Sequence, residues 1–169
     1  MTLFEGGSEQ VAFVAGLYLL RFACSIRIRT PYLKERTAVR LDAIVKGLNP
    51  KVEQRAATCS VSVKRVDLKN LRWIFIVDCG NGPKVVRVKA IRDGNIVKLS
   101  KMDLEVTCSC QAWRYLGPEY AAKTESYIDG KPRGTASPPN IKDPTRVNRV
   151  CKHVAAVLSQ VRAWQIPNK

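Results

Sequence analysis

The sequence lacks the features that mark several common classes of protein. It has no glycine-rich phosphate-binding loop, no Gly-x-Ser-x-Gly nucleophile motif and only one histidine among its 169 residues. No basic segment precedes the first apolar one, which predicts that there is no secretory signal peptide. The apolar stretch 11–20 is too short to cross a bilayer before Arg21 follows it. We therefore expect no enzyme, no small-molecule substrate and no membrane anchor.

Acidic residues are also scarce. The chain has 29 lysines and arginines against 14 aspartates and glutamates, which gives a net charge of +15 at pH 7. Such a charge favours acidic partners, including nucleic acid. However, the basic residues are spread along the chain with no run of five like charges, so the charge is a weak signal, and a solvated surface explains the basic residues better than a binding face. A hydrophobic content of 46% is enough for a folded core.

The six cysteines allow either disulfides or a metal site. The chain is longer than most disulfide-stapled scaffolds, and without a secretory signal we expect it to occupy a reducing compartment. On this interpretation Cys24, Cys59 and Cys79 are buried, unreactive thiols. The other three cysteines are candidates for metal ligands.

Residues 1–58 are predicted to form an N-terminal helical segment. Ser8 is a suitable N-cap for a helix over residues 8–24, and this helix would be apolar on almost every face. It is either a central core helix or a helix covered by another chain. A second helix is expected to start at Thr30-Pro31 and to end at Gly47 and Asn49-Pro50.

Residues 59–169 are predicted to combine a sheet with a C-terminal helix. From Cys59 to Cys108 apolar residues alternate with polar ones, and breaks such as residues 80–83 separate an antiparallel meander of about five strands. One of these strands is expected over residues 96–99. From Val150 apolar residues recur at helical spacing. The predicted class is α+β, with N-terminal helices, the meander, a long irregular loop and the C-terminal helix.

The insert, residues 111–150, shows no periodicity. Loops of this length are uncommon in compact domains unless they are functional or held from outside. Its four aromatic residues are candidates for partner contacts, because they offer large apolar surfaces. They are Trp113, Tyr115, Tyr120 and Tyr127.

Two short motifs flank this insert and predict a metal site. Cys108 and Cys110 would lie on the same side of an extended strand, about 6.6 Å apart at Cα. Cys151 and His153 can both reach the same ion if Cys151 precedes the first helical turn and His153 lies in it. Three thiolates and an imidazole suit tetrahedral zinc, and four protein ligands leave no position for a catalytic water. We therefore predict one structural zinc ion and no catalytic residues.

The pattern Cys-x-Cys after a meander, followed by Cys-x-His and Val-Ala-Ala-Val-Leu, resembles a SWIM-type zinc finger over residues 71–164. The resemblance implies that Cys108, Cys110, Cys151 and His153 are the zinc ligands. The longer string Cys-Ser-Cys-Gln-Ala-Trp-Arg-Tyr-Leu-Gly-Pro-Glu-Tyr is similar to long-insert members from tailed bacteriophages. That similarity implies a structural protein of the virion, assembled in the bacterial host cytoplasm.

Three functions follow as hypotheses. The first is a zinc-stabilised structural protein of a phage tail baseplate or neck, which contacts other virion proteins in a multi-subunit assembly. The second is a SWIM-type nucleic-acid-binding protein that uses Arg114, Tyr115 and Lys152 near the metal. The third, an enzyme with Cys151 and His153 as nucleophile and base, is disfavoured, because residues two apart are poorly placed for that pairing and both are predicted to bind metal.

Overall fold

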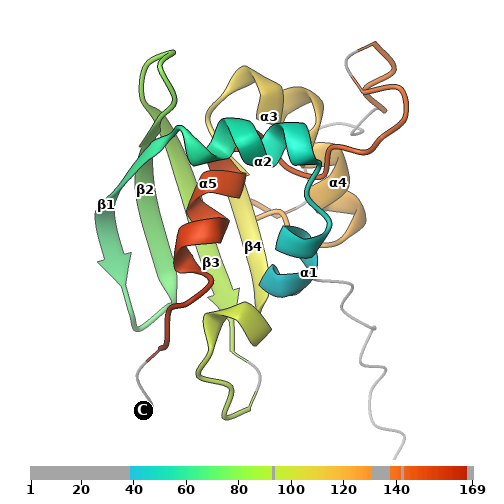
Figure 1. Ribbon diagram of the computed structural model, residues 1–169. Helices are drawn as coiled ribbons and strands as arrows, with labels where there is room; N and C mark the ends of the chain where they lie inside the picture. The colour runs from blue at the N-terminus through green and yellow to red at the C-terminus, as the bar shows by residue number, and fades with distance from the viewer. Residues whose placement is uncertain (1–38, 93, 131–137, 142, 167–169) are drawn as a thin grey trace, which may run out of the picture. The chain divides into compact units, whose positions relative to one another are not determined.

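The computed structural model describes residues 39–92, 94–130, 138–141 and 143–166 (Figure 1). The predicted helix over residues 8–24, the start of the second helix and Cys24 lie outside these ranges. The described residues belong to one compact unit, Lys34–Lys169. This unit includes residues 41–57, which the sequence interpretation assigned to the N-terminal segment. Among the described helices, none is long and apolar enough to span a membrane.

The described part of this unit contains five α-helices and four strands, which confirm the predicted α+β class. The strands are β1 (Ser60–Asp67), β2 (Arg72–Asp78), β3 (Lys84–Ile91) and β4 (Asp103–Cys108). The helices are α1 (Leu41–Lys46), α2 (Pro50–Ala57), α3 (Gln111–Tyr115), α4 (Gly117–Lys123) and α5 (Lys152–Val161). A short 3-10 helix, η1 (Leu99–Lys101), precedes β4.

The strands form an antiparallel meander in the order β1-β2-β3-β4. Alternation places one set of side chains of β2 and β3 on a single face, as period-two patterning requires. This face carries Trp73, Phe75 and Val77 of β2 and Val86 and Val88 of β3, all buried. The apolar face of the sheet is therefore the floor of the core.

Helix α5 covers this face of the sheet over β2, β3 and β4 (Figure 1). Its predicted stripe of Val154, Val157, Leu158 and Val161 is buried, which confirms the C-terminal helix. Ala155 and Ala156 are buried as well, because α1 and α2 pack against α5 on another side. A helix between two layers has little use for a polar face.

The sequence predicted that one helix would end near residues 47–50 and that no other helix would follow it directly. The structure instead has two helices in the segment 39–57, α1 and α2. Helix α1 ends at Lys46 with Gly47 as its C-cap, whereas Asn49-Pro50, which was predicted to help end that helix, begins the next one. The Asn49 side chain accepts a hydrogen bond from the backbone N–H of Lys51 at 3.0 Å, and Pro50 occupies the first turn of α2. Asparagine followed by proline suits both a break and a helix start, so the pattern alone did not reveal α2.

The prediction of a fifth strand over residues 96–99 is wrong, because these residues do not form a strand of the sheet. Leu99 begins η1, and the backbone of this stretch bonds to the C-terminal segment instead of to the sheet: Leu99 donates to Trp164 at 3.1 Å, and Ile166 donates to Val97 at 2.8 Å. Leu99 and Met102 are both buried. Their apolar side chains close one end of the core, so tertiary packing overrode the local β-propensity.

The prediction that Cys59 and Cys79 are buried free thiols is also wrong, because the structure joins them in a disulfide. Ser60 lies opposite Asp78 at one end of the β1–β2 pair. Cys59 and Cys79 are the next residues outward on each strand, with Cα atoms 4.2 Å apart. The register of two strands decides this pairing, and composition cannot show it.

Removal of this disulfide should destabilise the protein by about 2–4 kcal/mol, since it closes a loop of 20 residues in the unfolded chain. Thiol titration of the denatured protein should find two more thiols after reduction. A mild reductant should lower the melting temperature of the wild type but leave that of Cys59→Ser/Cys79→Ser unchanged. An equal thiol count before and after reduction would contradict the pairing.

Candidate metal centre

Four potential metal ligands converge between the end of β4 and the start of α5. Cys108 is the last residue of β4, and Cys110 is the N-cap of α3. Cys151 is the N-cap of α5, with extended backbone, and His153 lies in the first turn of that helix. The placement of Cys151 before the turn and His153 within it confirms the predicted geometry.

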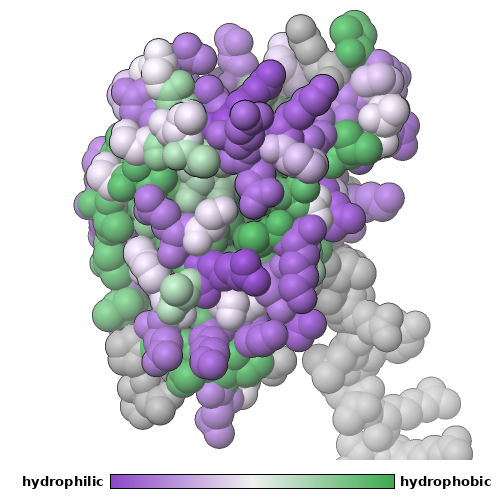
Figure 2. Space-filling view, in the orientation of Figure 1, coloured by the Kyte–Doolittle hydropathy of each residue, from purple (hydrophilic) through white to green (hydrophobic). Residues whose placement is uncertain are grey.

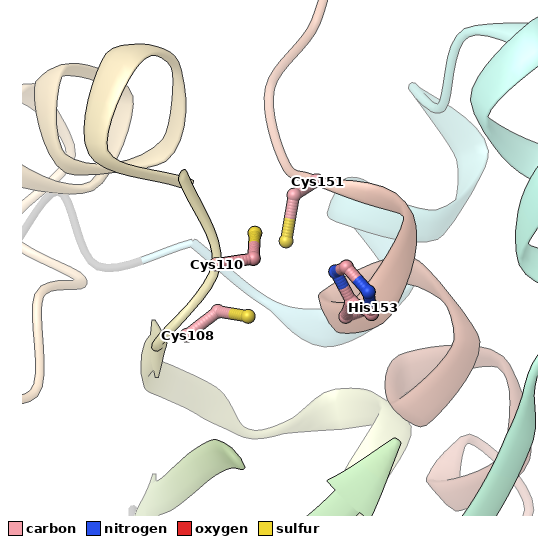
Figure 3. Close-up of side chains that lie close together, drawn as sticks. All are labelled: Cys108, Cys110, Cys151 and His153. Carbon is pink, nitrogen blue, oxygen red and sulfur yellow. The ribbon is translucent and has the colours of Figure 1, made fainter. Parts of the chain in front are cut away.

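The side chains of these four residues point toward one another (Figure 3). Their ligand atoms all lie within 4.8 Å of one another, and each residue is about 95% buried or more. In a tetrahedral site with metal–sulfur bonds of 2.3 Å, ligand atoms are roughly 3.8 Å apart. The cluster therefore has the size of a four-coordinate zinc site.

The three thiol groups hydrogen-bond to one another, and these bonds and burial shift their pKa values in opposite directions. Hydrogen bonds donated by Cys108 and Cys151 hold the pKa of Cys110 far below its usual range. The same hydrogen bond to Cys110 raises the pKa of Cys108 to about 12, and burial raises the pKa of Cys151. Zinc binds cysteine as the thiolate, so a bound cation would displace the thiol protons of this cluster.

His153 supplies the strongest test of whether a metal fits here. Both of its ring nitrogens are buried and have no hydrogen-bond partner among the described residues. An unpaired buried polar atom costs about 1–3 kcal/mol. A metal ion beside the three sulfurs would satisfy one of these nitrogens, so the residues fit one structural zinc ion. Such an ion would link β4, α3 and α5.

Ser109, the residue between the ligands Cys108 and Cys110, anchors the ligand loop (residues 108–110) to the sheet. Ser109 donates its backbone N–H to the Val85 carbonyl at 3.0 Å, and its hydroxyl accepts the Val85 N–H at 2.9 Å. The Cys110 sulfur also accepts the backbone N–H of Trp113 at 3.2 Å. These bonds fix the ligand loop through partners that sequence spacing did not predict.

A second anchor holds the segment that leads into Cys151. The buried carboxylate of Asp143 accepts the backbone N–H groups of Val147 at 3.2 Å and Asn148 at 2.9 Å. Asn148 in turn accepts a hydrogen bond from the Asn49 side chain at 3.1 Å. Asparagine and aspartate commonly organise turns, but their partners here are set only by the fold.

The insert contains more regular structure than predicted. Helices α3 and α4 occupy its first part, so the expectation of an irregular loop over residues 111–150 is wrong there. Both helices are short, which explains why periodicity did not reveal them. A Cβ on Gly117 would lie 1.9 Å from the Trp113 ring, so any other residue here would force the ring to move.

The four aromatic residues proposed for partner contacts occupy different environments. Trp113 is only 2% exposed and belongs to the core, so it is not available to a partner of the folded protein. Tyr127 and Tyr120 are half-buried; Tyr127 packs on the core, and the Arg149 guanidinium lies over the Tyr120 ring at 5.8 Å. Tyr115 is 61% exposed and is the most accessible of the four.

Comparison with known proteins agrees with this geometry. The family model described as SWIM zinc finger matches residues 97–118 and 148–162. These two segments contain all four clustered residues. No curated protein matches the chain. No solved structure matches it either.

The site and the family match together define a zinc-binding protein. More particularly, the two matched segments, which carry the two ligand pairs on either side of an insert, are similar to a zinc finger of the SWIM type.

Proposed function

We propose that this zinc finger has a structural role, in which it ties together the two ends of the insert, and that the protein acts through protein–protein contacts. The observation that supports this most is the distribution of exposed apolar side chains. The insert carries Tyr115, Ile141 and Val147, which are 61%, 91% and 50% exposed. The two ligand pairs lie at the two ends of this insert, where Cys110 caps α3 and Cys151 caps α5. Exposed apolar residues of this kind suit an interface.

The metal site supports a structural role for zinc and no enzymatic one. Four protein ligands fill a tetrahedral zinc ion, whereas catalytic zinc keeps a position open for water or substrate. All four residues are buried, so a substrate has no path to the ion that leaves the ligands in place.

The assembly that we propose is a tailed-phage particle, in which this chain would be a component of the tail baseplate or neck. The similarity of the Cys108–Tyr120 string to long-insert phage members supports this, together with the exposed apolar residues of the insert. The protein should then be present in intact particles and should copurify with other virion chains. Absence of its peptides from mass spectra of purified particles would refute this location.

Nucleic-acid binding is the second candidate, favoured by two exposed arginines beside the ligand pairs. Arg114 lies in α3 and Arg149 lies two residues before Cys151. If they contact phosphates, the affinity for duplex DNA should fall steeply with salt, with a log–log slope of about −0.9 for each contact. Arg114→Glu should then reduce that slope. Binding that does not respond to salt would exclude this function.

A further inference from the structure

Among the residues that the structure describes, strand β1 is the open edge of the sheet. The opposite edge, formed by β4, hydrogen-bonds to two other segments of the chain. The backbone N–H of Leu104 donates to the Val39 carbonyl at 3.4 Å, and the backbone N–H of Val106 donates to the Ser126 carbonyl at 2.7 Å. Within the described ranges, β1 pairs only with β2. A strand with one unpaired side offers backbone donors and acceptors to another strand.

The core-facing side of β1 is apolar but incompletely covered. Val63 and Val66 lie opposite Phe75 and Trp73 and therefore project from the same face as these core residues. Phe75 and Trp73 are 1% and 4% exposed, whereas both valines are 48% exposed. The difference arises because α5 covers β2 to β4. Figure 2 shows hydrophobic residues along the margin of the molecule where β1 lies.

The other side of β1 is basic. Arg65 lies opposite Ile74, which lies opposite Arg87 on β3, so two exposed arginines flank one isoleucine in a row across three strands. Neither arginine forms a salt bridge with another described residue. Lys64 stands at the bulge between Val63 and Arg65 and adds a third positive charge. Asp67 lies two residues beyond Arg65 on the same face and interacts with it electrostatically, so this face carries one acidic group among its basic ones. The edge is thus apolar on one face and net positive on the other.

The apolar and basic faces of β1 indicate which kind of partner can bind at this edge. A second copy of the chain is disfavoured, because antiparallel pairing of two β1 strands would bring their Lys64 and Arg65 side chains together. A nucleic acid would use the arginines but would leave the valines and the free backbone edge without partners. An extended peptide with alternating apolar and acidic residues satisfies the valines, the arginines and the backbone together.

We propose that the edge formed by β1 binds an extended, acidic segment of a partner protein, which adds a strand to the sheet with its apolar side chains on Val63 and Val66 and its carboxylates near Arg65 and Arg87. The proposal rests on the proposed function, because it names a surface and a partner chemistry for a protein that acts through protein contacts.

The test uses the zinc-loaded full chain and two labelled eight-residue peptides. One alternates glutamate with valine, and the other alternates lysine with valine. Fluorescence anisotropy should show that the glutamate peptide binds at least about tenfold more tightly than the lysine peptide. Amide hydrogen exchange should show that the glutamate peptide protects residues 60–67, as strand addition requires.

Matched variants separate the apolar and charged contributions. Val63→Thr/Val66→Thr should weaken binding of the glutamate peptide about tenfold. Arg65→Glu should weaken it by a similar factor, and Arg162→Glu, an exposed arginine at the end of α5, should not. Threonine keeps β-propensity, and zinc content reports that each variant is folded.

Four outcomes would overturn the proposal. They are equal binding of the two peptides, binding that the Val63/Val66 variant does not change, binding without protection of residues 60–67, and dimerisation of the protein alone through these valines. Competition by duplex DNA that depends on Arg65 but not on the valines would instead identify a nucleic-acid surface. Presence in virions with no strand addition would refute this inference alone and leave the proposed function standing.

Discussion

Removal of the zinc ion should unfold the C-terminal half of the protein. Structural zinc contributes about 10–16 kcal/mol in finger peptides, which is as large as the whole stability of a typical domain, about 5–15 kcal/mol. The ion would join β4, α3 and α5, and α5 is the helix that covers the sheet. Chelation at neutral pH should therefore abolish the cooperative thermal transition seen by circular dichroism.

Cys110→Ala should have the same effect. This side chain supplies a ligand and also accepts the Trp113 backbone N–H, so its loss damages both the site and the start of α3. Elemental analysis should find one zinc per chain in the wild type and none in the variant. Lys152→Ala is the matched control, since Lys152 lies between two ligands without being one, and it should retain zinc. A folded, metal-free protein at neutral pH would refute the site.

Trp113→Ala should cost about 3–5 kcal/mol of unfolding free energy, the usual range for removal of a large buried aromatic residue. Trp113 is 2% exposed and packs so closely on α4 that Gly117 has no room for a Cβ. Denaturant unfolding of the zinc-loaded protein measures the change. The cavity should weaken the packing of α3 on α4 and, through Cys110, the ligand loop.

Tyr115→Ala provides the control for this experiment. Tyr115 is two residues from Trp113 on the same short helix, but it is 61% exposed, so its loss should change stability by no more than about 0.5 kcal/mol. Trp113→Phe should cost less than Trp113→Ala, because it keeps an aromatic ring and removes a buried Nε1–H that has no partner among the described residues. Equal costs for Trp113→Ala and Tyr115→Ala would contradict the assignment of Trp113 to the core.

The two ligand pairs were predictable from the sequence because each is a local pattern. A Cys-x-Cys at a strand end and a Cys-x-His at a helix start need only the periods of strand and helix to define their geometry. The same periods located β2, β3, β4 and α5. Helices α3 and α4 span five and seven residues, too few for a helical period to be visible.

The aromatic residues of the insert show the limit of that reasoning. Trp113 and Tyr115 are both large aromatic residues and lie two positions apart in the sequence. Trp113 is buried, however, and Tyr115 is exposed. On a helix, residues two apart face different directions, and only the position of α4 and the sheet decides which direction is the core. Their roles could not be separated before the fold was known.

By itself, the sequence determined the α+β class, the strongest strands, the C-terminal helix and a zinc site of three cysteines and one histidine. Those features depend on local periodicity and on ligand chemistry. Tertiary structure alone decided that Cys59 pairs with Cys79, that Ser109 and Asp143 hold the ligand segments, and that β1 is left as an open edge among the described residues. These features depend on strand register and on packing between distant segments, which no local pattern encodes.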